Sequence, residues 1–86
     1  MDDRLMDGME EAFLALSHGY EKYGKALRRH VSPDEDILAG IGHAIAHLRG
    51  KPIDGETGVS ALGHAIARLC IAAKKLRDEE ETTVKC

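Results

Sequence analysis

Three stretches of the chain repeat apolar residues at the spacing of a helix. In the first, residues 4–29, the apolar side chains follow one another at steps of three or four: Leu5, Met9, Phe13, Leu16, Tyr20, Tyr23 and Leu27. The second and third stretches, 33–49 and about 60–78, place Ile37, Ile41, Ile45 and Leu48, and then Leu62, Ile66, Leu69, Ala73 and Leu76, on one face each. This spacing predicts three amphipathic helices whose apolar faces are buried. The fold class we expect is a small all-α domain of three helices.

Signals for helix ends set the expected boundaries. The cations at 28–30 suit the negative end of a helix dipole, so the first helix is expected to end there. Ser-Pro-Asp-Glu at 32–35 predicts a capping box at the start of the second helix. Thr57 or Ser60 is the expected cap of the third helix.

The C-terminal end has no such periodicity. The third helix is expected to end near Asp78, and the charged residues 81–86 are expected to form a frayed tail. Residues 1–80 then make up a single helical domain.

The second and third helices carry nearly the same short sequence. GIGHAIAHL at 40–48 and ALGHAIARL at 61–69 share Gly-His-Ala-Ile-Ala when His43 and His64 are aligned. Residues 50–58 between them are too rich in glycine and acidic residues to continue a helix. We therefore predict a central αα-hairpin in which the two histidines face each other.

Length and charge narrow the possible partners. A chain of 86 residues is near the size at which one apolar core barely suffices, and oligomerisation is a common remedy, so we expect a homo-oligomer. The net charge of −3 and the three aromatic residues argue against binding to a nucleic acid polymer. The chain shows neither a signal peptide nor a membrane span, so we expect a cytoplasmic protein without a membrane partner. Cys70 and Cys86 make no disulfide framework.

Histidines and one loop acid are the candidate chemistry of the hairpin. His43 and His47 share a helix face at a spacing of four, and a row of Asp36, Gly40, His43 and His47 follows from the same periodicity. With His64 and Asp54, a metal site of histidine and carboxylate ligands is conceivable. The plainer interpretation is that these histidines are polar residues beside contacts of small residues. The sequence leaves open whether these residues bind a metal ion.

Cations and tyrosines of the first helix are candidates for holding a phosphorylated ligand. Lys22, Lys25, Arg28, Arg29 and, on the third helix, Arg68 have the charge for phosphate contacts. Surface cations near a helix end need no ligand to explain them, and Tyr20 and Tyr23 more often pack than stack on a base.

Three blocks, taken in order, resemble a known family. LSHGYEKYG at 16–24 is similar to a "YGxxKYG" block, GHAIAHLRGKPID at 42–54 to "RHLxAWxxGExxD", and GETGVSALGHA at 55–65 to "PESGxxHLxHA". These are blocks of the N-terminal domain of phage dATP/dGTP diphosphohydrolases, which are grouped as MazG-like. The resemblance covers about residues 10–72.

The match to that family is partial. The residues that agree with the pattern are Gly19, Lys22, Tyr23, Gly24, His43, Gly50, Asp54, Gly58, Leu62 and His64. Gly42 stands where the family has arginine, Ala61 where it has histidine, and His47 where it has tryptophan. The acidic EExxE…ExxD metal motif of the wider MazG group is not found in the chain.

The resemblance implies a nucleotide ligand. The first hypothesis is a small phage-type, anti-defence protein that sequesters a nucleotide or a nucleotide-derived signalling molecule, linear or cyclic, in an oligomeric pocket in the cytoplasm of an infected bacterial host. Binding of this kind requires no cofactor. The candidate ligand-binding residues are Tyr20, Lys22, Tyr23, Gly24, Lys25, Arg28, Arg29, His43, His47, Asp54, His64 and Arg68.

Two other functions are weighed against it. In a metal-dependent dATP/dGTP diphosphohydrolase, Mg²⁺ or Mn²⁺ would activate water, Asp54 would be a ligand, and His43 and His64 would be the catalytic acid or base. The third hypothesis is a helical interaction module that binds no small ligand. Melting in the presence of nucleotides separates it from the first two, because a bound ligand raises the melting temperature.

Overall fold

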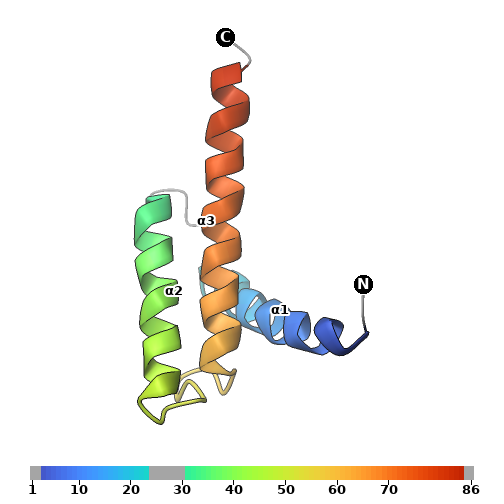
Figure 1. The fold of residues 1–86 in the computed structure, drawn as a ribbon, viewed down its shortest axis with the longest axis vertical. Helices are drawn as coiled ribbons and strands as arrows, with labels where there is room; N and C mark the ends of the chain where they lie inside the picture. Colours follow the sequence, from blue (N-terminus) through green and yellow to red (C-terminus); the bar gives the residue numbers. More distant parts are fainter. Residues whose placement is uncertain (1–2, 24–30, 85–86) are drawn as a thin grey trace.

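Three helices make up the described part of the chain. The computed structural model describes residues 3–23 and 31–84, with side chains at 4–18 and 31–79. The helices are α1 (Asp3–Tyr23), α2 (Pro33–Leu48) and α3 (Ala61–Val84), shown in Figure 1. A single antiparallel bridge joins Ile53 to Ser60, and the described residues contain no strand. The predicted three-helix, all-α fold is confirmed, while the predicted end of the first helix at 28–30 lies outside the described residues.

Local signals start and end α2. Ser32 Oγ accepts a hydrogen bond from the Glu35 backbone N–H, and the Ser32 N–H donates to the Glu35 carboxylate, each at 3.2 Å. This confirms the predicted capping box. At the other end Gly50 has a left-handed backbone (φ 89°), and the Lys51 N–H donates to the Ala46 carbonyl at 3.0 Å. This is a Schellman motif, which favours glycine because that φ strains other residues.

Ser60 caps α3, which runs further than the sequence pattern indicated. The Ser60 hydroxyl accepts the Gly63 N–H at 3.0 Å, so Ser60 and not Thr57 is the cap. The helix continues to Val84, so the predicted end near Asp78 is wrong. Residues 64–84 contain no glycine or proline, and nothing therefore breaks the helix at that point.

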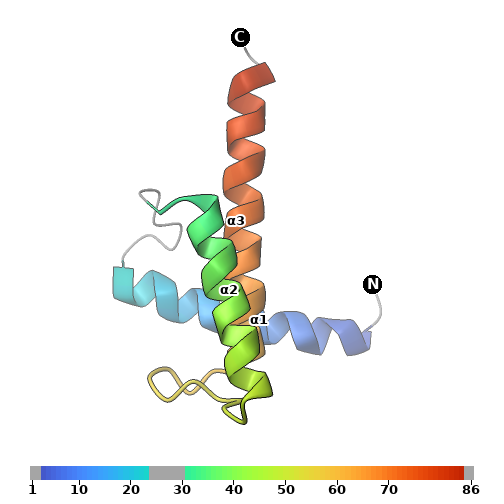
Figure 2. The same ribbon diagram turned by 60° about the vertical axis from the view of Figure 1, so that its left-hand side comes forward.

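α2 and α3 form a layer, and α1 lies on one side of it. Figures 1 and 2 show α2 and α3 side by side and antiparallel, with α1 crossing α3 steeply from behind. The C-terminal part of α3 projects beyond both other helices (Figure 1). Of the described helices, none combines the length and apolar character that crossing a membrane requires.

Small residues make the contacts between the helices. A Cβ added to Gly40 of α2 would lie 3.1 Å from the Ala65 carbonyl oxygen of α3, and one added to Gly63 of α3 would lie 2.6 Å from the Glu11 carbonyl oxygen of α1. The buried apolar residues are Ala12, Ala15, Val59, Ala61, Ala65, Ala67, Ile71 and Ala72. The described core therefore consists mostly of alanine methyl groups.

The prediction that the large apolar faces point inward is wrong. The predicted core residues that are exposed are Leu5, Met9 and Phe13 of α1, Ile41, Ile45 and Leu48 of α2, and Leu62, Ile66, Leu69, Ala73 and Leu76 of α3. Glycine and alanine allow a closer backbone approach than leucine, and the row containing Asp36 finds cationic partners on α3. The small and polar rows therefore face inward and the large apolar rows face outward. Leu16 and Ile37 are half-buried, and Tyr20, Tyr23 and Leu27 fall outside the described side chains.

Replacing Gly63 with alanine tests the contact between α1 and α3. The added methyl would overlap backbone atoms of Glu11, so α1 must shift, and overpacking of this kind costs about 1–3 kcal/mol. Gly42→Ala is the matched control, because a Cβ there meets nothing within 4 Å. Replacing an open helical glycine with alanine stabilises by about 0.5–1 kcal/mol. Urea denaturation measures both variants, and equal changes in the free energy of unfolding would contradict the close contact.

Candidate functional site

The two histidines of the repeated sequence lie face to face. His43 of α2 and His64 of α3 have ring centroids 5.1 Å apart and an angle of 25° between the ring planes. His43 follows Gly40 by three residues, so the close approach at Gly40 brings this turn of α2 against α3. The prediction that the two copies of Gly-His-Ala-Ile-Ala bring their histidines together is confirmed geometrically.

The connecting loop folds back onto the start of α3. The Asp54 N–H donates to the Val59 carbonyl at 2.9 Å, and the Gly58 N–H donates to the Asp54 carbonyl at 2.8 Å. Gly58 has a left-handed backbone (φ 73°), which permits this tight turn. Val59 is buried in a cluster with Ala15 and Ala67. This anchor fixes the loop, and with it Asp54, beside the N-terminal turn of α3.

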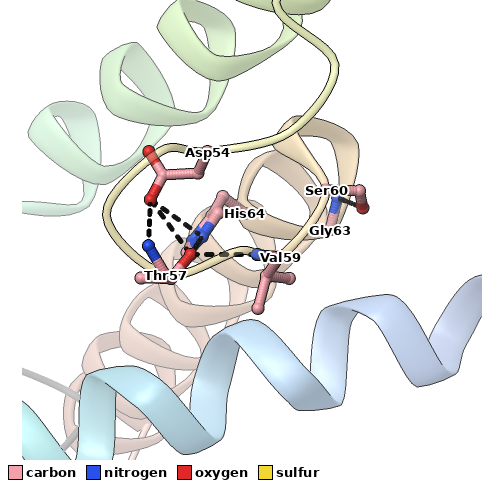
Figure 3. A network of polar contacts seen from close by, with 6 residues as sticks. All are labelled: Asp54, Thr57, Val59, Ser60, Gly63 and His64. Atoms are coloured by element: carbon pink, nitrogen blue, oxygen red, sulfur yellow. Dashed lines mark hydrogen bonds and ion pairs between the residues drawn. The ribbon is translucent and has the colours of Figure 1, made fainter.

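A chain of polar contacts joins Asp54 to His64 through Thr57 (Figure 3). Asp54 Oδ2 accepts the Thr57 N–H at 2.9 Å and the Thr57 hydroxyl at 3.0 Å. Thr57 Oγ1 lies 2.7 Å from His64 Nε2, and Asp54 Oδ2 lies 3.9 Å from the same nitrogen. Asp54 therefore acts on His64 chiefly through the threonine hydroxyl.

The hydrogen-bonding capacity of Thr57 determines where the proton of His64 resides. A hydroxyl has one proton to donate, and an ionised carboxylate can only accept, so the Thr57 proton points to Asp54. Thr57 Oγ1 then accepts from the Val59 N–H at 3.2 Å and from His64 Nε2–H. With Nε2 carrying the proton, Nδ1 of a neutral His64 is left as an acceptor.

Burial and neighbouring charges move two pKa values in this site. The backbone N–H of Thr57, followed by its hydroxyl and by His64, lowers the pKa of Asp54 against a smaller opposing effect of burial. Asp54 is therefore ionised at neutral pH. Burial is the main cause that lowers the pKa of His43 below 6.5, with His64 and Arg68 adding to it and Asp54 opposing it. His43 is therefore neutral at pH 7.

A buried carboxylate lies between α2 and α3, two turns of α2 before His43. The side chain of Asp36 is only 2% exposed; Oδ1 is 2.9 Å from Arg68 Nη2, and Oδ2 is 2.7 Å from Lys75 Nζ. Lys75 also donates to the Val31 carbonyl at 2.9 Å. Asp36 therefore holds both Arg68 and Lys75, and we call these three side chains the Asp36–Arg68–Lys75 cluster.

Arg68 connects the buried cluster to the histidine pair. It follows His64 by four residues and so lies one turn further along α3. Its guanidinium binds Asp36, and its side chain is 24% exposed. Among the described residues, the buried Nε of Arg68 has no hydrogen-bond partner. Buried polar groups normally have one, so this N–H is a donor whose partner the described residues do not supply.

The structure brings together only some of the predicted site residues. His43, His64, Asp54 and Arg68 lie in one region, as described above, whereas His47 is exposed on the last turn of α2. Tyr20, Lys22 and Tyr23 are on α1, but their side chains are outside the described part, as are Gly24, Lys25, Arg28 and Arg29 entirely. The described residues contain no group of three or more His, Cys, Asp or Glu side chains placed to hold a metal ion.

Two residues of the site were missed by sequence reasoning. Thr57 was considered only as a helix cap, although an aspartate in a loop commonly accepts hydrogen bonds from backbone groups of the residues that follow it. Lys75 carried no signal of its own, because its role depends on the burial of Asp36.

Replacing Asp36 with asparagine tests the buried cluster. The change leaves two cations without their anion in a mostly buried place, and breaking a buried pair in this way costs about 3–5 kcal/mol. Asp34→Asn, an exposed position in the same first turn, should cost less than about 1 kcal/mol. Chemical denaturation compares the two, and a similar small loss for both would contradict the importance of the cluster.

The lowered pKa of His43 predicts a pH dependence of stability. As the pH falls below about 6.5, the unfolded chain takes up a proton at this position before the folded protein does. The free energy of unfolding therefore decreases with falling pH and levels off below the lowered pKa. Urea denaturation at about pH 7.5 and about pH 5 should show a smaller difference for His43→Gln than for the wild type. His47→Gln, at an exposed position of the same helix, should keep the wild-type difference.

Neither a protein-family model, nor a curated protein, nor a solved structure matches this chain. The resemblance to the phage dATP/dGTP diphosphohydrolases therefore stays a prediction from the sequence blocks.

Proposed function

We propose that a homo-oligomer of this chain binds a phosphorylated nucleotide, or a signalling molecule derived from one, and sequesters it. α2, the loop and α3 act in this proposal as the αα-hairpin that carries the ligand site. The ligand would contact the His43–His64 pair, Arg68 and the loop around Asp54. The resemblance of the sequence blocks to a nucleotide-hydrolysing family supports the choice of ligand class.

The state of Arg68 is the observation that carries the proposal. Its guanidinium is held on one side by Asp36, and its buried Nε has no partner in the described structure. A guanidinium held in this way is pre-organised for phosphate oxygens, because little side-chain freedom is lost on binding.

The histidines suit recognition of the less charged part of the ligand. His43 is neutral at pH 7 because burial and neighbouring cations lower its pKa. A neutral imidazole donates and accepts hydrogen bonds and offers a flat face, so His43 can contact a base or a ribose. Asp54 and Thr57 hold the ring of His64 in one orientation, which reduces the entropy that binding would cost.

One observation favours hydrolysis as the second candidate. Asp54 is ionised, and the contacts through Thr57 leave Nδ1 of His64 as an acceptor that can take a proton from water. A metal-dependent diphosphohydrolase would in addition need Mg²⁺ or Mn²⁺. Asp54 and the phosphate oxygens of the substrate are the oxygen donors that would hold such an ion.

Recovery of the ligand separates the two functions. Purified protein is incubated with a pool of nucleotides and signalling dinucleotides in the presence of Mn²⁺, and the filtrate and the denatured protein are each chromatographed. Sequestration predicts one compound that is missing from the filtrate and recovered intact from the protein. Conversion of a triphosphate to a monophosphate would instead establish the hydrolase, and an unchanged pool would contradict both.

A conservative variant tests the role of Arg68. Arg68→Lys keeps a cation beside Asp36 but lacks the Nε donor, so we expect the affinity for the recovered compound to fall by about tenfold. Arg49→Lys, an exposed position at the end of α2, should leave the affinity unchanged. Titration calorimetry measures both.

Asp54→Asn should change the affinity only modestly, whereas it would abolish turnover by the hydrolase.

A further inference from the structure

Large apolar side chains of α2 and α3 are exposed in the described part of the chain. On α3, Gly63 and Ala67 lie against α1, and Ala65 lies against Gly40 of α2. A third row of α3 is exposed and consists of Leu62, Ile66, Leu69, Ala73 and Leu76. Helical geometry places this row away from α1.

α2 carries a matching row on the same side. Its members are Leu38, Ile41, Ile45 and Leu48. A Cβ added to Gly40 would lie 3.3 Å from Leu69 Cγ, so the α3 row borders α2 directly. Helical spacing places both rows outside the contact between α2 and α3 and away from α1. α1 crosses the opposite face of the layer (Figures 1 and 2). We call this surface, made of the two rows, the apolar face.

We infer that the apolar face binds the apolar face of a second copy of the chain, so that two copies form a four-helix bundle with twofold symmetry. The inference rests on the proposed function in one respect, since it supplies the contact surface of the proposed homo-oligomer. It goes further by naming the residues that make this contact.

The area of the apolar face fits a small interface between two copies. Its eight large side chains are between 41% and 82% exposed, which together equals about four fully exposed side chains. Fully burying a leucine or isoleucine stabilises by ~1.5–3 kcal/mol at ~25 cal/mol per Å², which corresponds to roughly 60–120 Å² per side chain and on the order of 250–500 Å² per copy. This area lies below the ~800 Å² per partner of a standard interface and belongs to the small, weaker interfaces. The largest apolar patch on a typical monomer is of this size, about 300–600 Å², and such patches often take part in binding.

The composition of the chain favours a second copy over another partner. The described core holds alanines together with only Val59 and Ile71, whereas the leucines and the other isoleucines of α2 and α3 are mostly exposed. Small domains with so little buried apolar volume commonly gain stability by association. A twofold contact needs a self-complementary surface, and two antiparallel rows of leucine and isoleucine, without a charged residue in either row, meet this requirement.

The histidine site and the apolar face lie on different sides of the layer. His64 packs against Thr57, and the loop that carries Thr57 is anchored through Val59 to Ala15 of α1. Figure 3 shows this loop above α1. Association through the apolar face therefore leaves both copies of the histidine site open to ligand.

Two neighbouring positions of α2 provide a matched test. Ile41→Glu places a charge in the middle of the apolar face, and Gly42→Glu places the same charge one residue on, where a Cβ meets nothing within 4 Å. In analytical ultracentrifugation from about 1 to about 100 µM, we expect a wild-type dimer. The dimer dissociation constant should rise at least about 100-fold for Ile41→Glu, because each dimer would bury two charges, and stay unchanged for Gly42→Glu.

A wild-type chain that is monomeric over this range would overturn the inference, as would an assembly that Ile41→Glu leaves intact. If Ile41→Glu does not fold, the association state of the wild-type chain alone decides whether the inference holds. A dimer that stabilises its subunits has a melting temperature that rises with protein concentration, and a constant melting temperature would overturn the inference. Ligand recovery is measured separately, so a dimer that binds no nucleotide would refute the proposed function and leave the inferred surface standing.

Discussion

The backbone contact between α2 and α3 at Gly40 is the constraint on which the described structure depends most. No side chain larger than hydrogen fits there without displacing the Ala65 carbonyl or Leu69. Asp36 precedes Gly40 by one turn, and His43 follows it by nearly one turn. The contact with Arg68 on one side and the ring pair with His64 on the other both require the close approach of the two helices. One glycine therefore positions both the buried cluster and the candidate site.

The polar groups in this interface determine which arrangement of the helices is stable. A buried charge costs free energy unless it is paired, and Asp36 is paired with Arg68 and Lys75. Sliding α3 past α2 by one turn would separate all three side chains, so the alternative registers are strongly disfavoured. Buried ion pairs often add little net stability and act in this way on specificity. The register that they select is also the one that aligns His43 with His64.

Local structural signals could be predicted from the sequence, but which face of each helix is buried could not. The capping box at Ser32 depends on residues a few positions apart, and the facing histidines depend on an exact repeat. The direction in which Ile41 or Leu69 points depends on what the rest of the molecule offers as a partner. Hydrophobic periodicity gives two sides of a helix but does not say which side meets another helix of the same chain. For the same reason Lys75 could not be assigned a role before Asp36 was known to be buried.

The outward direction of the apolar rows follows from the same small-residue contacts. Alanine and glycine allow helices to approach closely, yet each alanine buries only a methyl group, so three helices packed in this way remove little apolar area from water. The leucines and isoleucines are left on the other side of each helix. In the dimer that we infer, these rows would pack against each other and become the main core. The periodicity of α2 and α3 would then describe the core of the assembly, which a single chain does not contain.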